Sequence, residues 1–188
     1  CNYTEYKSKL NYAHVLARLR KKQGKYKIIF IVESNQKWGW QSVYDELKKD
    51  DRFELLLVTL PLTTRFKDKI YPQKEDIAFF SKLGMPIIDG YDYKKGICMD
   101  LEKLGADIIF YTHPWFVDVH KIPPAETSKF ALTCAVSYGF NLVESRLWGT
   151  TTPRNFCSNL WTMFAESKFH KGFYEKGTNL KNKDILLV

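Results

Sequence analysis

Apolar residues occur along the chain in short continuous runs, separated by stretches in which they recur every three or four positions. The runs predict buried strands and the spaced stretches predict helices. The predicted strands are residues 28–32, 54–60, 86–88, 107–112, 130–136 and 184–188, and the predicted helices between them are residues 41–49, 74–83, 96–104 and 155–176. Continuous apolar strands that alternate with helices are typical of a parallel sheet covered on both faces. We therefore expect an α/β, Rossmann-like fold with a mostly parallel sheet and helices on both faces.

A basic amphipathic stretch precedes these elements. Its apolar positions are Leu10, Ala13, Leu16, Ala17 and Leu19, with lysines and arginines between them. This near-helical spacing predicts a helix within residues 1–26, and Gly24 follows as a stop signal. We expect the apolar stripe to dock on the protein's own domain, with an acidic membrane surface as the alternative partner. Residues 27–188 are then predicted to form one Rossmann-like domain.

The chain of 188 residues carries a net charge of +8, from 29 Lys and Arg against 21 Asp and Glu. This excess favours anionic partners. The lysines near the C-terminus alternate with aromatic residues at helical core spacing, so we expect a solvated helix face there and no nucleic-acid partner. Because the sequence starts at Cys1 without a methionine and stops within an apolar run, we expect it to be a piece of a longer protein.

The four cysteines lie far apart and form no Cys-x-x-Cys pair. The sequence therefore predicts buried, reduced thiols and no metal site. No apolar run approaches the length of a membrane span, and no signal-peptide pattern is present. We expect a cytoplasmic location. If the basic helix binds an acidic membrane surface, the protein would also contact the inner face of the cell membrane peripherally.

The segment after the first predicted strand offers the first candidate site residues, Glu33, Ser34, Trp38 and Trp40. It lacks the G-x-G-x-x-G spacing of dinucleotide folds, and the chain has no P-loop, so we expect no NAD, FAD or other cofactor. Tryptophan rings beside a hydroxyl group suit a sugar or polyol ligand. The alternative is that one or both tryptophans seal the next helix against the sheet.

Two later strands also deliver candidate residues to the carboxyl end of the sheet, where ligands of open α/β sheets bind. His113 and Trp115 follow residues 107–112, and Tyr138 and Gly139 follow residues 130–136. His113 is a candidate general acid or base, because its ordinary pKa lies near neutral pH. The alternatives are a histidine bonded to its own loop and a tyrosine packed in the core.

Several segments together resemble a known family. They are Trp38-Gly39-Trp40-Gln41-Ser42-Val43-Tyr44, Ile109-Phe110-Tyr111-Thr112-His113-Pro114-Trp115, Phe130-Ala131-Leu132-Thr133-Cys134 with Ser137-Tyr138-Gly139-Phe140, and residues 155–188. From about residue 27 to Val188, the chain resembles the N-terminal half of the CDP-glycerol glycerophosphotransferases, GT-B-type enzymes that build teichoic acids and capsular polymers.

The resemblance implies one half of a two-domain GT-B architecture. The acceptor, a polyol phosphate or glycan chain, would face this domain, and the CDP-activated donor would bind a C-terminal domain that this chain does not contain. Polymerases of the family carry a Trp-His-Gly-Thr-Pro signature where this chain reads Ser137-Tyr138-Gly139-Phe140. Three alternatives stay open: His113 has taken over the role of the family's histidine, this branch uses another chemistry, or the protein no longer catalyses.

The resemblance predicts a transferase that moves glycerol phosphate or a related group to a cell-surface polymer, with this fragment inactive by itself. We expect His113 to be the catalytic base and Glu33 the second candidate, with Ser34, Trp38, Trp40, Trp115, Tyr138 and Gly139 binding substrate. Two other functions remain alternatives. One is a non-catalytic module that binds a polyol or sugar, and the other is a GT-B glycosyltransferase or epimerase that uses a UDP-sugar.

Overall fold

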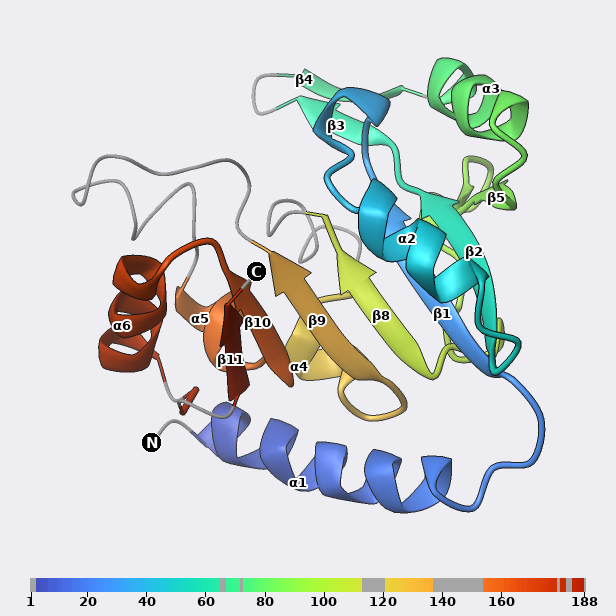
Figure 1. Cartoon of the computed structure of the whole chain (residues 1–188). Coiled ribbons are helices and arrows are strands. Elements are labelled where there is room, and N and C mark those ends of the chain that lie inside the picture. Colours follow the sequence, from blue (N-terminus) through green and yellow to red (C-terminus); the bar gives the residue numbers. More distant parts are fainter. Residues whose placement is uncertain are drawn as a thin grey trace. The chain divides into compact units, whose positions relative to one another are not determined.

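A computed structural model describes residues 3–64, 67–71, 73–112, 121–136, 154–178, 180–181 and 184–187. The chain divides into two compact units, which we name the β1 unit (Gln23–Thr112) and the β9 unit (Cys1–Lys22 with His113–Val188). The helix predicted for residues 1–26 therefore groups with the C-terminal strands. Strands of both units appear in Figure 1 as arrows.

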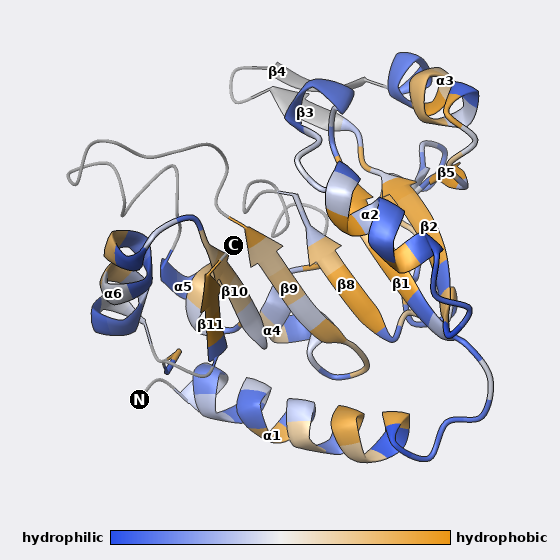
Figure 2. Cartoon of the chain, viewed as in Figure 1, coloured by the Kyte–Doolittle hydropathy of each residue, from blue (hydrophilic) through white to orange (hydrophobic). Residues whose placement is uncertain are grey.

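The β1 unit is built on four parallel strands in the order β8-β1-β2-β5. They are β1 (Tyr26–Val32), β2 (Phe53–Thr59), β5 (Ile87–Asp89) and β8 (Ile108–Tyr111). Helix α2 (Gln41–Lys48) packs on β2, and α3 (Lys74–Lys82) packs on β5. The strands are the most hydrophobic part of the unit (Figure 2), and Ile28 to Val32 are at most 3% exposed.

The β9 unit contains three parallel strands in the order β11-β10-β9. They are β9 (Leu132–Val136), β10 (Thr162–Ala165) and β11 (Ile185–Leu187). The helices of this unit are α1 (Tyr3–Leu19), α4 (Pro124–Thr127), α5 (Arg154–Ser158) and α6 (Lys168–Gly177). Helix α6 packs on β10 and β11, and α1 packs on α4 and β9. Parallel strands flanked by helices in each unit confirm the predicted α/β, Rossmann-like fold.

Helix α1 docks through a face that overlaps the predicted apolar stripe at Leu19 but is otherwise different. Its buried positions are Ser8, Tyr12, Val15 and Leu19, whereas Leu10 is 46% exposed and Ala13 and Ala17 are exposed. The buried polar groups have partners inside the unit: Oγ of Ser8 donates to Oδ1 of Asn159 at 2.7 Å, and the hydroxyl of Tyr12 donates to the carbonyl oxygen of Asn159 at 2.6 Å. The docked face therefore includes polar side chains that are satisfied by hydrogen bonds, and apolar spacing alone did not reveal it.

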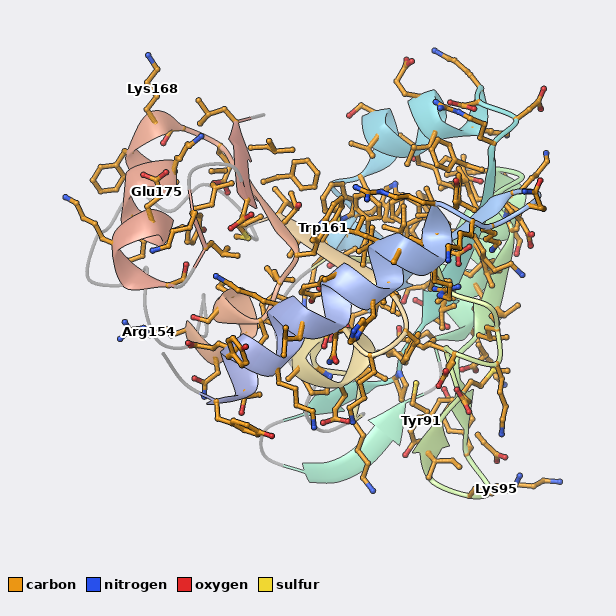
Figure 3. All side chains as sticks on the ribbon, turned by 90° about the horizontal axis from the view of Figure 1, so that it is seen from below. Tyr91, Lys95, Arg154, Trp161, Lys168 and Glu175 are labelled. Carbon is orange, nitrogen blue, oxygen red and sulfur yellow. The ribbon has the colours of Figure 1, made fainter. Side chains whose placement is uncertain are left out.

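Two of the predicted helices are wrong. Residues 96–104 were expected to be helical, but the chain there completes a hairpin of β6 (Tyr91–Asp92) and β7 (Ile97–Cys98) and then turns. The carboxylate of Asp92 accepts from the backbone N–H groups of Lys94 and Lys95, and Gly96 has φ +68°, so the turn is closed locally. Tyr91 and Lys95 mark this hairpin in Figure 3.

The helix predicted over residues 155–176 is two helices, α5 and α6, with strand β10 between them. The strand pairs with β9 and β11, so its apolar side chains are buried by neighbours distant in sequence. The short α4 and the antiparallel hairpin of β3 (Leu62–Thr64) and β4 (Lys67–Tyr71) were not predicted from the sequence. Among the described residues, no helix combines the length and apolar character that a bilayer crossing requires.

Candidate functional site

The strand order of the β1 unit places a switch point at the carboxyl end of β1. From β1 the chain continues to β2 and β5 on one side, and then returns to β8 on the other side. Ligands of open α/β sheets bind where the strand order reverses in this way. Glu33 directly follows β1, and Thr112 directly follows β8, where its Oγ1 donates to the carbonyl oxygen of Ile31 at 2.9 Å. This edge is the candidate site.

Glu33 is the buried charge of the candidate site. It is 2% exposed, and the Nζ atom of Lys37 lies 3.8 Å from its Oε2. The short 3-10 helix η1 (Asn35–Lys37) brings the two side chains together by turning the chain back after the strand. The ammonium group of Lys37 is thus placed to offset part of the desolvation cost of the buried carboxylate.

The loop that carries Glu33 is held by two further side chains. Oγ of Ser34 accepts from the backbone N–H of Gln36 at 3.3 Å and so caps η1. The N–H of Asn35 donates to Oδ1 of Asp76, a residue in the first turn of α3, at 2.5 Å. The loop conformation at the switch point is therefore held by a hydrogen bond within the loop and by a second one from α3, which is distant in sequence.

The two tryptophans of the loop have different surroundings. Trp40 is 3% exposed, and its ring meets Phe110 edge-on at a centroid distance of 4.9 Å. It seals α2 on the sheet, which was the alternative interpretation, and it offers no ring face to a ligand in this conformation. Trp38 is partly exposed; its ring packs edge-on against Phe30 and Phe80, and its Nε1–H donates to Oε1 of Gln41. Of these two tryptophans, Trp38 is thus the one that is available at this edge.

The carboxyl ends of β2 and β5 add two polar residues that the sequence analysis did not single out. Thr59 ends β2 and is fully buried, and its Oγ1 donates to the carbonyl oxygen of Ile88 at 3.3 Å. Asp89 ends β5 and accepts from the backbone N–H of Tyr91. The pKa of Tyr93 is raised to about 12, mainly by burial and in second place by the neighbouring Asp89 carboxylate. An acidic residue directly after an apolar run is the same signal that identified Glu33, so Asp89 could have been predicted.

Lys37 and Asp76 were also missed. Lys37 stands four positions after Glu33, but that spacing brings side chains together only if the segment turns helically, and η1 was not predicted. Asp76 comes from α3, distant in the chain, and no local signal connects it with Asn35. Four other predicted site residues, His113, Trp115, Tyr138 and Gly139, lie outside the described residues.

A separate polar cluster follows β10 in the β9 unit. Ser167 caps α6 by accepting from the N–H of His170, and its Oγ is 2.9 Å from Nδ1 of the same imidazole. Oε2 of Glu166 is 3.6 Å from that Nδ1, and His170 is 1% exposed. The cluster fixes the turn from β10 into α6, and it is the arrangement of a helix cap. The labelled Lys168 and Glu175 show the direction of α6 in Figure 3.

The described cysteines do not supply a nucleophile. Burial raises the pKa of Cys98 and of Cys157 to about 12, and it also raises the pKa of the fully buried Cys134. All three are free thiols. Thiols with such pKa values are protonated at neutral pH and are poor nucleophiles. No group of three or more His, Cys, Asp or Glu within the described part of the chain is arranged to hold a metal ion.

Chemically, this edge of the β1 unit combines an anchored carboxylate, an ammonium group, a partly exposed indole and a helix-capping hydroxyl. The Lys37 side chain, one-quarter exposed, can meet an anion such as a phosphate. The Glu33 carboxylate accepts hydrogen bonds and can orient a hydroxyl group. The set suits a ligand that carries both hydroxyl and phosphate groups.

Comparison with known proteins supports the fold. No protein-family model matches the sequence, and no curated protein matches it. Among solved structures, the chain is similar to a glycosyltransferase from Rickettsia africae ESF-5, with a TM-score of 0.51 and 11% sequence identity. The match covers 88% of this chain and 43% of that structure. The chain therefore shares its α/β architecture with less than half of a glycosyltransferase.

Proposed function

We propose that this chain is the acceptor-side domain of a GT-B-type transferase that moves glycerol phosphate, or a related group, from a CDP-activated donor to a cell-surface polymer. The observation that carries the proposal is the extent of the structural match, which takes in most of this chain but 43% of the glycosyltransferase. That extent is expected if the chain is one half of a two-domain enzyme. The resemblance of the sequence to the CDP-glycerol glycerophosphotransferases supports the choice of donor.

The candidate site is suited to an acceptor that is a polyol phosphate. We assign Lys37 to an acceptor phosphate, Trp38 to the carbon face of the polyol, and Glu33 to the orientation of the attacking hydroxyl group. The acceptor oxygen forms a bond to the β-phosphorus of the donor, the bond from that phosphorus to the CMP oxygen breaks, and CMP leaves. His113, the residue after Thr112, is our candidate base for the hydroxyl proton.

A sugar-nucleotide donor is the second candidate, because the structural neighbour is a glycosyltransferase. Lys37, Trp38 and Glu33 would keep the same roles toward the acceptor, and the leaving group would be UDP. The two candidates therefore differ in the nucleotide that is released.

The test uses the protein encoded by the complete reading frame. CDP-glycerol or a UDP-sugar is supplied together with an oligomer of glycerol phosphate, and the released nucleotide is measured. We expect acceptor-dependent release of CMP, and His113→Ala should lower kcat by more than about tenfold. Lys103→Ala, an exposed substitution that precedes β8 and so lies away from its carboxyl end, is the matched control and should leave kcat unchanged.

Release of UDP from the UDP-sugar, without CMP release, would replace the first candidate by the second. Release of neither nucleotide would contradict both. An unchanged kcat in His113→Ala would remove His113 as the base and leave Glu33→Gln as the next variant to measure.

A further inference from the structure

Helix α1 presents a second apolar face that the fold does not use. Its docked face is Ser8, Tyr12, Val15 and Leu19. Another set of positions is exposed: Tyr3, Tyr6, Leu10, Ala13 and Ala17. The exposed fractions are 77% for Tyr3, 56% for Tyr6 and 46% for Leu10.

The exposed set follows the helical repeat. Its members are spaced by three and four residues, as are those of the docked set, so each set forms one stripe along α1. At about 100° per residue, the two stripes lie roughly half a turn apart. Docking on α4 and β9 therefore leaves the second stripe, which we call the outer stripe, facing away from them.

Basic residues flank the outer stripe on both sides. At helical angles, Lys7 stands on one side and Lys9 on the other, and Arg20 and Lys21 follow the end of the helix. Glu5 is the one acidic residue of α1, and it lies toward the docked side. An apolar stripe between cations, with aromatic residues at one end, is the pattern of a helix that lies in a membrane interface.

An apolar groove adjoins the outer stripe in the same unit. It measures about 320 Å³, and Ala13 and Leu16 of α1 face Leu160, Trp161 and Leu180 across it. Tyr12, Lys9, Lys181 and Asp184 complete the lining. Trp161 lies beside α1 in Figure 3, where the helix is seen from below. The groove thus extends the apolar surface of α1 sideways and adds the ammonium group of Lys181, together with the carboxylate of Asp184, to that of Lys9.

We propose that the outer stripe and this groove bind an anionic phospholipid bilayer. The tyrosines and Leu10 would enter the boundary between headgroups and acyl chains, and the lysines would contact lipid phosphates while their aliphatic parts remain on the apolar side. Each cation near an anionic surface adds to the binding, and salt weakens this contribution. The inference concerns the β9 unit and does not depend on the proposed transferase activity.

Charge favours a bilayer over a second copy of the chain. Pairing two outer stripes would bring the flanking lysines and arginines of both copies together, and like charges at such distances repel. An anionic surface instead attracts both flanks at once. The occupant that complements all of these residues is therefore an extended negative surface with an apolar interior.

Co-sedimentation with vesicles tests the proposal on this chain as it stands. Vesicles of phosphatidylcholine with phosphatidylglycerol are compared with vesicles of phosphatidylcholine alone, at low and high salt. The variants are Tyr6→Ser with Leu10→Asp, and Lys7→Glu with Lys21→Glu. Phe169→Ser with Lys168→Glu is the matched control, because Phe169 is 58% exposed on α6 of the same unit.

We expect binding to the anionic vesicles alone, weakened by salt, and a loss of at least about tenfold in both α1 variants but not in the control. Circular dichroism on each variant separates lost binding from lost folding, since the changed side chains are exposed. Absence of binding, or equal losses in the α1 and control variants, would overturn the proposal. Concentration-dependent dimerisation that Leu10→Asp abolishes, without vesicle binding, would assign the outer stripe to a second copy instead.

Discussion

Glu33 and Lys37 hold a carboxylate oxygen and an ammonium nitrogen 3.8 Å apart, and the carboxylate side chain is 3% exposed while the lysine is 25% exposed. The pair therefore joins a buried anion to a cation that still reaches water. This asymmetry leaves Lys37 accessible to a ligand while Glu33 stays fixed at the end of β1.

Replacing Lys37 should destabilise the β1 unit because Glu33 loses the cation beside it. We expect Lys37→Met to lower the free energy of unfolding by about 2 kcal/mol, less than for a fully buried pair. In the background of Glu33→Gln, the same change should cost less than about 0.5 kcal/mol, since no buried charge remains to be compensated. Urea unfolding of the four chains measures this cycle, and equal costs in both backgrounds would show that the two groups are not coupled.

Gly90 should tolerate no larger residue. A Cβ atom there would lie 2.3 Å from Cγ1 of Val58 and 2.8 Å from the carbonyl oxygen of Thr59, and the second contact is with backbone. Gly90→Ala should therefore lower the free energy of unfolding by about 1–3 kcal/mol. Gly172→Ala is the control, because nothing lies within 4 Å of its Cβ position and it sits inside α6. That change should be neutral or stabilising by up to about 1 kcal/mol, and a Gly90→Ala chain as stable as this control would contradict the prediction.

Removing the hydroxyl of Tyr12 should destabilise the β9 unit, even if the ring is kept. It lies 2.5 Å from Oγ1 of Thr133 and donates to the carbonyl oxygen of Asn159, both buried in the β9 unit. Tyr12→Phe would leave the carbonyl oxygen of Asn159 without this donor and the hydroxyl of Thr133 without this partner, so we expect a loss of about 1–3 kcal/mol in thermal or urea unfolding. Tyr6→Phe removes a hydroxyl from an exposed position of the same helix and should change stability by less than about 0.5 kcal/mol. Indistinguishable values for the two variants would argue against the buried network.

The cysteines should make the chain less stable at alkaline pH. In the folded chain, burial raises the pKa of Cys98 and Cys157 from 9.0 to about 12. Between these values the unfolded chain loses thiol protons that the folded chain keeps. The contribution of these protonated thiols to the free energy of unfolding is therefore complete below pH 9. It declines as the pH rises, by up to about 1.4 kcal/mol per pH unit for each thiol.

Urea unfolding from pH 8 to pH 11 measures that slope. Cys98→Ala should make it shallower without much loss at pH 8, because Cys98 is less buried than Cys157. A slope that is the same with and without Cys98 would show that other groups cause the alkaline loss.

The strands of the β1 unit could be predicted because each is a continuous apolar run that a parallel sheet buries on both faces. Each predicted strand of that unit lies within about two residues of the observed one. Strand β10 could not be separated from its flanking helices, because Thr162–Ala165 is short and its pairing partners, β9 and β11, are distant in sequence. The helix predicted at residues 96–104 was wrong for a local reason. Asp92 and Gly96 close a hairpin there, and this turn was not recognised in the sequence.

For the candidate site, the sequence located the edge of the sheet but not its internal contacts. Glu33 was found because it directly follows a buried strand. The burial of Trp40 and the approach of Asp76 to Asn35 depend on how α2 and α3 pack, which no local pattern records. Tertiary packing therefore decided which predicted residues remain at the site.

The most direct measurement is a titration of the ¹⁵N-labelled chain with a short oligomer of glycerol phosphate, followed by NMR. We expect shifts that begin at the amides of Glu33, Asn35 and Lys37 and at the indole N–H of Trp38, and that Lys37→Met abolishes. Shifts confined to the β9 unit, or none at millimolar oligomer, would contradict the assignment of the acceptor site to the carboxyl end of β1.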